Sequence, residues 1–566
     1  MNRIPYIALA MLLLLTGCTK EEGETPLPSP PVVTMAGGST ILTTKAGRGI
    51  EIRPDYENAD EALFCWELDG RQIGDGPTLR FSSDEPGSYF ITLTVTNRGG
   101  GAELALRVDV LALAPPTIAL PGADEGYTLL EGSTLELRPI IASTLETSCR
   151  WSVDGETVST ERDYVFAGYA RGDYRVRLDA RNEDGEDSVE FTVGVRSPEE
   201  VDFSWTFEQE SYNVSKGRTI RLRAIEVEYA FDAEYVWSVG GTEVARGPQP
   251  EFAFTAETEG EFVVRAEMRN AYLTASHELR VHVCPEEGTY YRPQTGNARC
   301  DKVYEFLPAP GQFINEGYSA ATMAEACAYA EGRLGQTAYV SLGGFGGYIV
   351  VGFDHSVDND GGYNLAVTGN SFGDSSEPGI VWVMQDENGD GLPNDTWYEL
   401  RGSEYGKPET LSDYAVTYYR PAEVGGDVPW RDNIGGSGTI EQNPFHRQSY
   451  YPAWVEAESY TLRGVRLESR SYDPSGNGSN WINPPFDWGY ADNFSPIDRL
   501  TGGDNPNAAP QDNHFRISDA VTFDGRAANL KYIDFVKIQT AVNQSCGRIG
   551  EVSTEVLGVK DYNAIK

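Results

Sequence analysis

A tryptophan motif recurs three times at nearly constant spacing along the chain. Trp66, Trp151 and Trp237 lie 85 and 86 residues apart, and each is followed four residues later by glycine. About 31 to 33 residues after each tryptophan, a segment of alternating apolar residues ends in asparagine. A repeat of this length indicates a domain that occurs several times in tandem. The alternation predicts strands with one buried face.

The repeat predicts a mainly β protein with three tandem β-sandwiches of immunoglobulin type. We place these domains at residues 31–113, 114–197 and 198–284. Because the same tryptophan recurs in each unit, we expect it to fill the sandwich core. Stacking of a ligand on these tryptophans is the minor alternative.

The W-x-x-x-G motif and the later strand that ends near asparagine resemble PKD domains. The resemblance covers about residues 31–284. It implies three PKD-like spacer domains, which would hold the last domain of the chain away from a membrane.

The N-terminus predicts export and lipidation. An apolar run from about Ile7 to Leu15 is too short to span a bilayer comfortably, and Leu15-Thr16-Gly17-Cys18 is a bacterial lipobox. We expect residues 1–17 to be a signal peptide, Cys18 to carry a lipid anchor, and residues 18–30 to be an acidic, proline-rich tether. The acidic residues after Cys18 resemble the surface-export signal of Bacteroidetes lipoproteins. This implies an outer-membrane lipoprotein exposed on the cell surface.

The net charge limits which kinds of partner the protein can bind, and the export signal decides whether its cysteines can form disulfides. With 45 basic and 86 acidic residues the formal net charge is −41, which argues against nucleic-acid binding. An exported protein can form disulfides. Cys284 and Cys300 flank a loop-like stretch and are the best candidates for a pair, whereas Cys65 and Cys149 are expected to be buried single residues.

Composition changes at Cys284, and residues 285–566 form the expected C-terminal ligand-binding domain. Residues 314–334 carry apolar side chains at helical spacing and predict a helix. The rest reads as strands and glycine-rich turns. We expect a jelly-roll-like β-sandwich larger than the repeats, with one helix and long loops.

An acidic loop, 385-QDENGDGLPNDTWYEL-400, predicts a calcium site. Oxygen ligands alternate as in the first half of an EF-hand loop, with a glycine for the sharp turn. The predicted ligands are Asp386, Asn388, Asp390, the carbonyl group of Leu392, and Asp395. The position of the usual terminal glutamate is Trp397, so the loop departs from an EF-hand. An asparagine- and aspartate-rich turn without metal is the alternative. We expect a structural Ca²⁺ that fixes the loop beside Trp397.

Aromatic side chains are dense between residues 445 and 494, among glycine, asparagine, proline and serine. Aromatic rings can pack on the face of a flat ligand, and amide side chains can hydrogen bond to polar groups around its edge. The candidate ligand-binding residues are Trp481, Trp488, Tyr490, Trp454, Tyr450 and His446. We expect Trp481, Trp488 and Tyr490 to be exposed, and about half of all aromatic residues in this stretch to belong to the core. A corrinoid and a glycan fit this chemistry equally well.

Catalytic motifs are absent from the sequence. It has no HExxH, G-x-S-x-G or Walker loop, and only five histidines. His446 and His514 lie in polar loops and could contact a ligand. We therefore expect a binding protein and not an enzyme, although 86 acidic residues leave a carboxylate pair possible.

Several segments resemble the cobalamin-capturing surface lipoproteins of gut Bacteroidetes, which place a vitamin B12-binding domain beyond PKD-like or Ig-like spacers. They are Gly343–Gly347, 352-GFDHSV-357, the acidic loop and 488-WGYADN-493. The resemblance implies capture of cobalamin or another corrinoid and delivery to a TonB-dependent outer-membrane transporter. A glycan-binding lipoprotein of a polysaccharide-uptake system and a calcium-dependent carbohydrate-active enzyme are the alternatives.

Overall fold

A computed structural model describes residues 27–566 apart from 121, 124–125 and 500–510. The signal peptide and Cys18 lie outside the described residues. The described chain is mainly β, which confirms the predicted fold class, and within it no helix is long and apolar enough to cross a membrane.

The chain divides into two compact units. Among the described residues, the first consists of residues 27–117 with two short segments, Ser143–Thr147 and Arg181–Asp187, and the second holds the remainder. Each unit is described by itself below.

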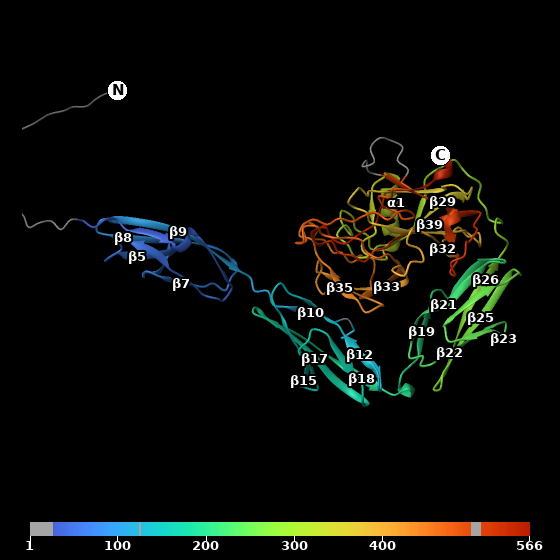
Figure 1. Ribbon diagram of the computed structural model, residues 1–566, viewed down its shortest axis with the longest axis horizontal. Helices are drawn as coiled ribbons and strands as arrows, with labels where there is room; N and C mark the ends of the chain where they lie inside the picture. The colour runs from blue at the N-terminus through green and yellow to red at the C-terminus, as the bar shows by residue number, and fades with distance from the viewer. Residues whose placement is uncertain (1–26, 121, 124–125, 500–510) are drawn as a thin grey trace, which may run out of the picture. The chain divides into compact units, whose positions relative to one another are not determined.

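The first repeat is a β-sandwich (blue in Figure 1). Its elements are β1 (Val32–Met35), η1 (Ala36–Gly38), β2 (Ile41–Lys45), β3 (Ile50–Ile52), β4 (Pro54–Glu57), β5 (Leu63–Leu68), β6 (Arg71–Gly74), β7 (Leu79–Phe81), β8 (Gly87–Asn97) and β9 (Gly100–Leu111). A five-stranded sheet, β2-β9-β8-β5-β6, shares one core with the pairs β1-β4 and β3-β7. Trp66 on β5 is fully buried in that core, and its Nε1 donates a hydrogen bond to the Gly76 carbonyl at 2.8 Å.

The second repeat has the same plan. Its elements are β10 (Thr117–Ala119), β11 (Tyr127–Leu130), β12 (Thr134–Leu137), β13 (Ile140–Ala142), β14 (Ser148–Val153), β15 (Glu156–Ser159), β16 (Tyr164–Ala167), β17 (Gly172–Asn182), β18 (Gly185–Arg196) and η2 (Pro198–Glu200). The five-stranded sheet is β11-β18-β17-β14-β15. Trp151 on β14 is fully buried, and its Nε1 donates to the Arg162 carbonyl at 3.1 Å.

The third repeat completes the series. Its elements are β19 (Ser204–Phe207), β20 (Ser211–Ser215), β21 (Thr219–Glu228), β22 (Glu234–Val239), β23 (Thr242–Gly247), β24 (Glu251–Thr255), β25 (Gly260–Arg269) and β26 (Thr274–Cys284). Sheets β20-β26-β25-β22-β23 and β19-β21-β24 enclose a core around Trp237, which is 1% exposed. The prediction that all three tryptophans are core residues is confirmed.

We expect Trp151→Ala to lower the free energy of unfolding of the second repeat by about 3–5 kcal/mol, because the deletion leaves a large cavity and removes a buried hydrogen bond. Urea unfolding followed by circular dichroism measures the effect. The half-buried Tyr174→Ala in the same core serves as a smaller-effect comparison. Equal losses for the two variants would contradict a central packing role for Trp151.

Outside residues 500–510, the C-terminal domain contains fifteen strands and one α-helix (yellow to red in Figure 1). Its elements are β27 (Lys302–Leu307), α1 (Met323–Gly335), β28 (Val340–Ser341), β29 (Tyr348–Asp358), β30 (Leu365–Gly369), β31 (Gly379–Met384), β32 (Trp397–Leu400), β33 (Leu411–Tyr419), β34 (Val428–Asp432), β35 (Ser437–Ile440), β36 (Ser459–Arg466), β37 (Gln511–Phe515), η3 (Ile517–Asp519), β38 (Ala520–Val521), β39 (Tyr532–Thr540), η4 (Gly547–Ile549), β40 (Glu555–Val556), β41 (Gly558–Asp561) and η5 (Tyr562–Ala564). They form a six-stranded sheet β27-β29-β39-β31-β32-β38, a three-stranded sheet β37-β30-β41, a four-stranded sheet β35-β34-β33-β36 and the pair β28-β40.

The inner face of the six-stranded sheet packs on the main core of this domain. Val383 on β31 and Val536 on β39 share that core with Val367 of the three-stranded sheet and Ala330 of α1. Residues of one strand alternate between the two faces of a sheet. The outer face therefore carries the intervening residues, which form the cleft described below.

The helix is shorter than the sequence pattern predicts. Residues 314–334 were expected to be helical, but α1 begins at Met323. The side chain of Thr322 accepts a hydrogen bond from the backbone N–H of Glu325 and caps the first turn. This N-cap sets the start of the helix, and the apolar residues before it belong to a non-helical segment.

The predicted disulfide is wrong. Cys284 and Cys300 are both free, as are the four other cysteines in the described part of the chain. Cys284 is buried at the end of β26, while Cys65 and Cys149 are free and half-buried. A loop between two cysteines in the sequence carries no information on whether their Cα atoms approach closely enough to be bridged.

Candidate functional site

Three side chains stand in a row on the outer face of the six-stranded sheet. In the strand register Trp382 on β31 pairs with Lys537 on β39 and with Glu399 on β32. Directly paired residues project from the same face of a sheet. A tryptophan is thus flanked by a lysine on one side and a glutamate on the other.

This row lines a cleft of the second unit with a volume of about 900 Å³. The C-terminal domain contributes most of the lining, and residues 208–225 of the third repeat contribute the rest; both belong to the same compact unit. Aromatic side chains are prominent in the part of the wall that the C-terminal domain provides: Trp382, Trp397, Tyr398, Tyr405 and Phe523.

Two polar atoms of the cleft wall are buried without a protein partner. In the described part of the chain, neither Trp382 Nε1 nor Gln539 Oε1 has a hydrogen-bond partner. The amide nitrogen of Gln539 donates to the carbonyl groups of Gly346 and Arg463, so the orientation of its side chain is fixed. A buried donor and a buried acceptor without partners are unfavourable unless something else satisfies them.

The charged members of the row have shifted pKa values. Burial lowers the pKa of Lys537 to about 8, although the charge of Glu305 opposes this effect. Burial raises the pKa of Glu399 to about 7. Shifts caused by desolvation are common where a ligand is held. The ammonium group of Lys537 lies over the ring of Tyr348, with Nζ 4.3 Å from the ring centroid.

Three of the six predicted ligand-binding residues are core residues. Tyr490 is one of them, so the prediction that it is exposed is wrong. Tyr450, Trp454 and Tyr490 are at most 8% exposed. The hydroxyl oxygens of Tyr450 and Tyr490 accept backbone N–H groups of Asn443 and Glu404, both at 2.9 Å. Their rings pack on neighbouring strands, and none is available to stack on a ligand. Aromatic residues among turn residues look alike in sequence whether they cover a core or face solvent.

The other three predicted ligand residues lie apart from one another. Trp481 is half-buried against a separate hydrophobic cluster, and His446 Nδ1 lies 2.6 Å from Glu316. Trp488 lines a second cleft of about 230 Å³ together with His514, whose Nδ1 hydrogen bonds to the backbone carbonyl of Asp498 at 2.9 Å. The structure does not bring the six predicted residues into one site.

The acidic loop is ordered by its own hydrogen bonds. Asp386 accepts the backbone N–H groups of Gly389 and Gly391 at 2.8 and 3.1 Å, and Asp390 accepts that of Leu392 at 2.8 Å. Asn388 Nδ2 donates to Asp390 Oδ2 at 2.9 Å. These contacts fold the predicted ligands into one compact turn between β31 and β32.

A buried pair of acids lies beneath this turn. Asp395 and Glu387 are 3% and 4% exposed, and each keeps one carboxylate oxygen without a hydrogen-bond partner in the described part of the chain. Burial raises the pKa of both to about 8, and the charge of Glu387 adds to the effect on Asp395. Glu387 was missed in the sequence because it occupies an even position of the alternating ligand pattern. A buried carboxylate oxygen without a partner is unfavourable unless it is protonated or a cation binds it.

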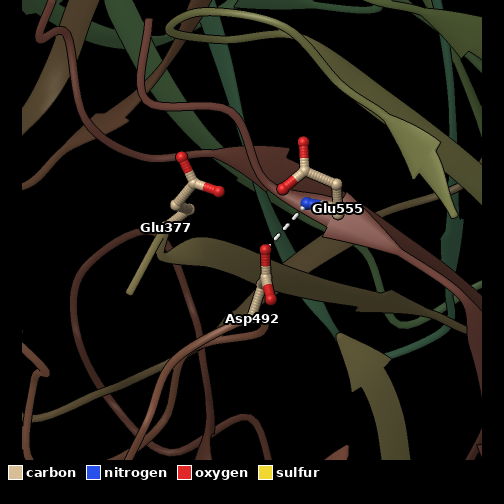
Figure 2. A group of neighbouring side chains, drawn as sticks. All are labelled: Glu377, Asp492 and Glu555. Carbon is tan, nitrogen blue, oxygen red and sulfur yellow. Dashed lines mark hydrogen bonds between the residues drawn. The ribbon is translucent and has the colours of Figure 1, made fainter. Parts of the chain in front are cut away.

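A second acidic cluster was not expected from the sequence. Glu377, Asp492 and Glu555 each offer a carboxylate oxygen, and these atoms lie within 4.8 Å of one another (Figure 2). Among the described residues, no other three histidine, cysteine or acidic side chains lie this close together. The acids of the 386–395 loop form no such group. We call these three residues the acidic trio.

Asp492 is the structural centre of the acidic trio. Its Oδ1 accepts the backbone N–H groups of Asn370 and Ser371, both at 2.8 Å, and its Oδ2 accepts that of Glu555 at 2.9 Å. Burial, followed by the charge of Glu377, raises the pKa of Asp492 to about 8. Burial raises the pKa values of Glu377 and Glu555 as well. The three residues are far apart in the sequence, so no local motif marks them.

Comparisons with known proteins bear on the repeats. Residues 30–97 and 115–182 match the PKD-like domain family. Solved structures with similar folds include Sidekick-1 immunoglobulin domains 1–5 (17% identity, TM-score 0.23), covering 47% of this chain and 61% of that one. The titin I-band fragment I67–I69 (13%, TM-score 0.21) covers 45% of this chain and 98% of that one. The Clostridium thermocellum CbhA fibronectin(III)-like modules (15%, TM-score 0.18) cover 29% and 95%. No curated protein matches the sequence.

Proposed function

We propose that the protein is a cell-surface lipoprotein of the outer membrane that captures cobalamin and passes it to a TonB-dependent transporter. The observation that carries this proposal is the cleft on the outer face of the six-stranded sheet. PKD-like repeats serve as spacers between the lipid anchor at Cys18 and the domain that holds the cleft.

The dimensions and lining of the cleft suit a large polar ligand. Small-molecule sites usually occupy roughly 300–1,000 Å³, and the cleft of about 900 Å³ lies at the upper end of that range. Cobalamin combines a flat corrin ring with peripheral amides. Aromatic side chains cover ring faces, and the buried donor of Trp382 and acceptor of Gln539 offer hydrogen bonds to amides.

Binding without conversion is the role that the cleft supports. Lys537 and Glu399 have shifted pKa values, but Trp382 separates them in the strand register. A nucleophile with an adjacent base, as covalent catalysis requires, does not occur in this row. We propose a binding protein.

Calorimetric titration of the mature chain with cyanocobalamin tests the proposal. We expect saturable binding, with affinity up to about tenfold weaker in Trp397→Ala, because each well-packed aromatic contact contributes about 0.5–1.5 kcal/mol. Trp397 lines the large cleft, so this variant reports on that cleft. Trp488→Ala is the matched control in the smaller cleft and should bind normally.

Absence of both heat and a spectral change in the wild-type chain would reject cobalamin. A polysaccharide array would then test the glycan alternative, because aromatic faces and polar edges also suit sugars. Loss of binding in Trp488→Ala alone would move the ligand to the smaller cleft.

We also propose a structural Ca²⁺ in the acidic loop, held by Asp386, Asn388, Asp390, the Leu392 carbonyl group and Asp395. The buried, unpaired oxygen of Asp395 supports this assignment. A cation there would offset the repulsion between the acids and stiffen the turn that precedes Trp397 on β32.

Calcium should raise the thermal midpoint of the wild-type chain and leave that of Asp390→Ala nearly unchanged. At a calcium concentration 100-fold above Kd the stabilisation is about 2.7 kcal/mol. Differential scanning calorimetry with calcium and with chelator measures it. Asp374→Ala, an exposed aspartate outside the loop, is the control and should respond like the wild type. A calcium response that persists in Asp390→Ala would contradict the site.

A further inference from the structure

The large cleft contains five basic side chains, an unusual number for so acidic a chain: Arg221, Arg223, Lys407, Arg463 and Lys537. The first four each lie within 4.0 Å of a carboxylate. Among the described residues, none places a carboxylate within that distance of Lys537. Lys537 is therefore the cleft cation without a carboxylate at salt-bridge distance, and the charge of Glu305 acts on it from farther away.

Lys537 is half-buried, so its ammonium group is unfavourable where it is unless an anion accepts its hydrogen bonds. It lies in β39 between Val536 and Ile538, which both belong to the main core. Its Nζ contacts the face of Tyr348, which attracts the ammonium group but accepts no conventional hydrogen bond. A half-buried ammonium group is stabilised when an anion accepts its hydrogen bonds.

Glu399, the third member of the row, has an acidic side chain, whereas Lys537 has a basic one. Glu399 lines the same cleft on the other side of Trp382. Adjacent strands are about 4.8 Å apart, so the backbone positions of Lys537 and Glu399 are separated by roughly 10 Å across the sheet. An anion is attracted to the Lys537 end of the row and repelled from the Glu399 end, whereas groups that donate hydrogen bonds suit Glu399.

We propose that Lys537 binds an anionic group of the ligand, a phosphate or a carboxylate, with the ring system of the ligand toward Trp382 and its hydrogen-bond donors toward Glu399. This inference rests on the proposed function, because it names the part of the ligand that the same cleft selects. In cobalamin the matching group is the phosphodiester of the nucleotide loop, and in a glycan it would be a uronate.

A pair of corrinoids separates the anionic group from the ring. Dicyanocobinamide keeps the corrin and most amides but lacks the phosphodiester. We expect Lys537→Gln to weaken cyanocobalamin binding about tenfold to a hundredfold, because a charge-assisted hydrogen bond contributes about 1.5–3 kcal/mol. Its affinity for dicyanocobinamide should equal that of the wild type. The matched control is Lys531→Gln, at a lysine that is 71% exposed outside the cleft.

Equal weakening for both corrinoids, or for neither, would overturn the assignment of Lys537 while leaving cobalamin capture intact. Circular dichroism and thermal unfolding of Lys537→Gln show whether the variant keeps its fold. A wild-type chain that binds no corrinoid would reject the proposed function but would not decide the role of Lys537.

A second measurement decides that role without any corrinoid. Reductive methylation of the wild-type chain, with mass spectrometry of the labelled peptides, reports the reactivity of each lysine. Inorganic phosphate should slow the labelling of Lys537 at least severalfold and leave that of Lys531 unchanged. Equal labelling rates for Lys537 with and without phosphate would overturn the anion site.

Discussion

Asp492→Ala should lower the free energy of unfolding of the C-terminal domain by about 3–6 kcal/mol. The substitution leaves three backbone N–H groups without an acceptor, and a buried donor that loses its partner costs about 1–3 kcal/mol. The donors belong to Asn370, Ser371 and Glu555, and Asp492 is 1% exposed. Urea unfolding followed by tryptophan fluorescence at pH 6 measures the loss.

Asp492→Asn is the graded control for this variant. Its amide oxygen retains the two hydrogen bonds from Asn370 and Ser371 and gives up the one from Glu555. The asparagine variant should therefore lose less than half as much stability as the alanine variant. An alanine variant within about 1 kcal/mol of the wild type would show that water or another acceptor replaces the carboxylate.

Glu555→Gln should raise the thermal midpoint at pH 8 by about 3–6 °C, which corresponds to roughly 1–2 kcal/mol for a domain of this size. Glu555 is buried beside two other carboxyl groups, and its pKa is well above the usual value, first through burial and then through the charges of Glu377 and Asp492. A neutral amide removes one of the charges that would repel each other in the acidic trio.

The sign of the pH dependence follows from the direction of these shifts. A carboxyl group whose pKa is higher in the folded than in the unfolded chain contributes stability fully below its unfolded pKa, near 4. That contribution is lost as the pH rises toward the folded pKa, which is about 8 for Asp492. The wild-type midpoint should thus fall between pH 5 and pH 8, and that of Glu555→Gln should fall less.

Glu409→Gln, at an exposed position, is the control for a general loss of negative charge. It should follow the wild-type pH profile. A midpoint that decreases in Glu555→Gln at pH 8 would contradict this account of the acidic trio, and a decrease seen only with a divalent cation present would indicate that the three carboxylates share a metal.

Much of the fold could be predicted because the buried residues of each repeat recur at regular positions in the sequence. A tryptophan every 85 or 86 residues and strands that alternate apolar and polar residues gave the three sandwiches. The same residues, Trp66, Trp151 and Trp237, are the buried centres of the three repeats. Local periodicity suffices here because one face of each strand is buried and the other is solvated.

The predicted site was less accurate because burial in irregular segments has no period. Tyr450, Trp454 and Tyr490 lie among turn residues, yet all three fill cores. The acidic loop was recognisable because its ligands are close in sequence. One signal for the large cleft was available: Lys537 stands between Val536 and Ile538 in a strand, where a lysine is costly unless it has a role.

Sequence patterns were enough for the number and type of the repeats, the β-rich character of the last domain and the position of the acidic loop. They could not bring Trp382, Glu399 and Lys537 into one row, or Glu377, Asp492 and Glu555 into one cluster. These groupings depend on which strands pair and in which register, and that choice is made by long-range packing of both sheet faces. Contacts between residues more than a hundred positions apart leave no trace in local spacing, so they emerge only when the chain is folded.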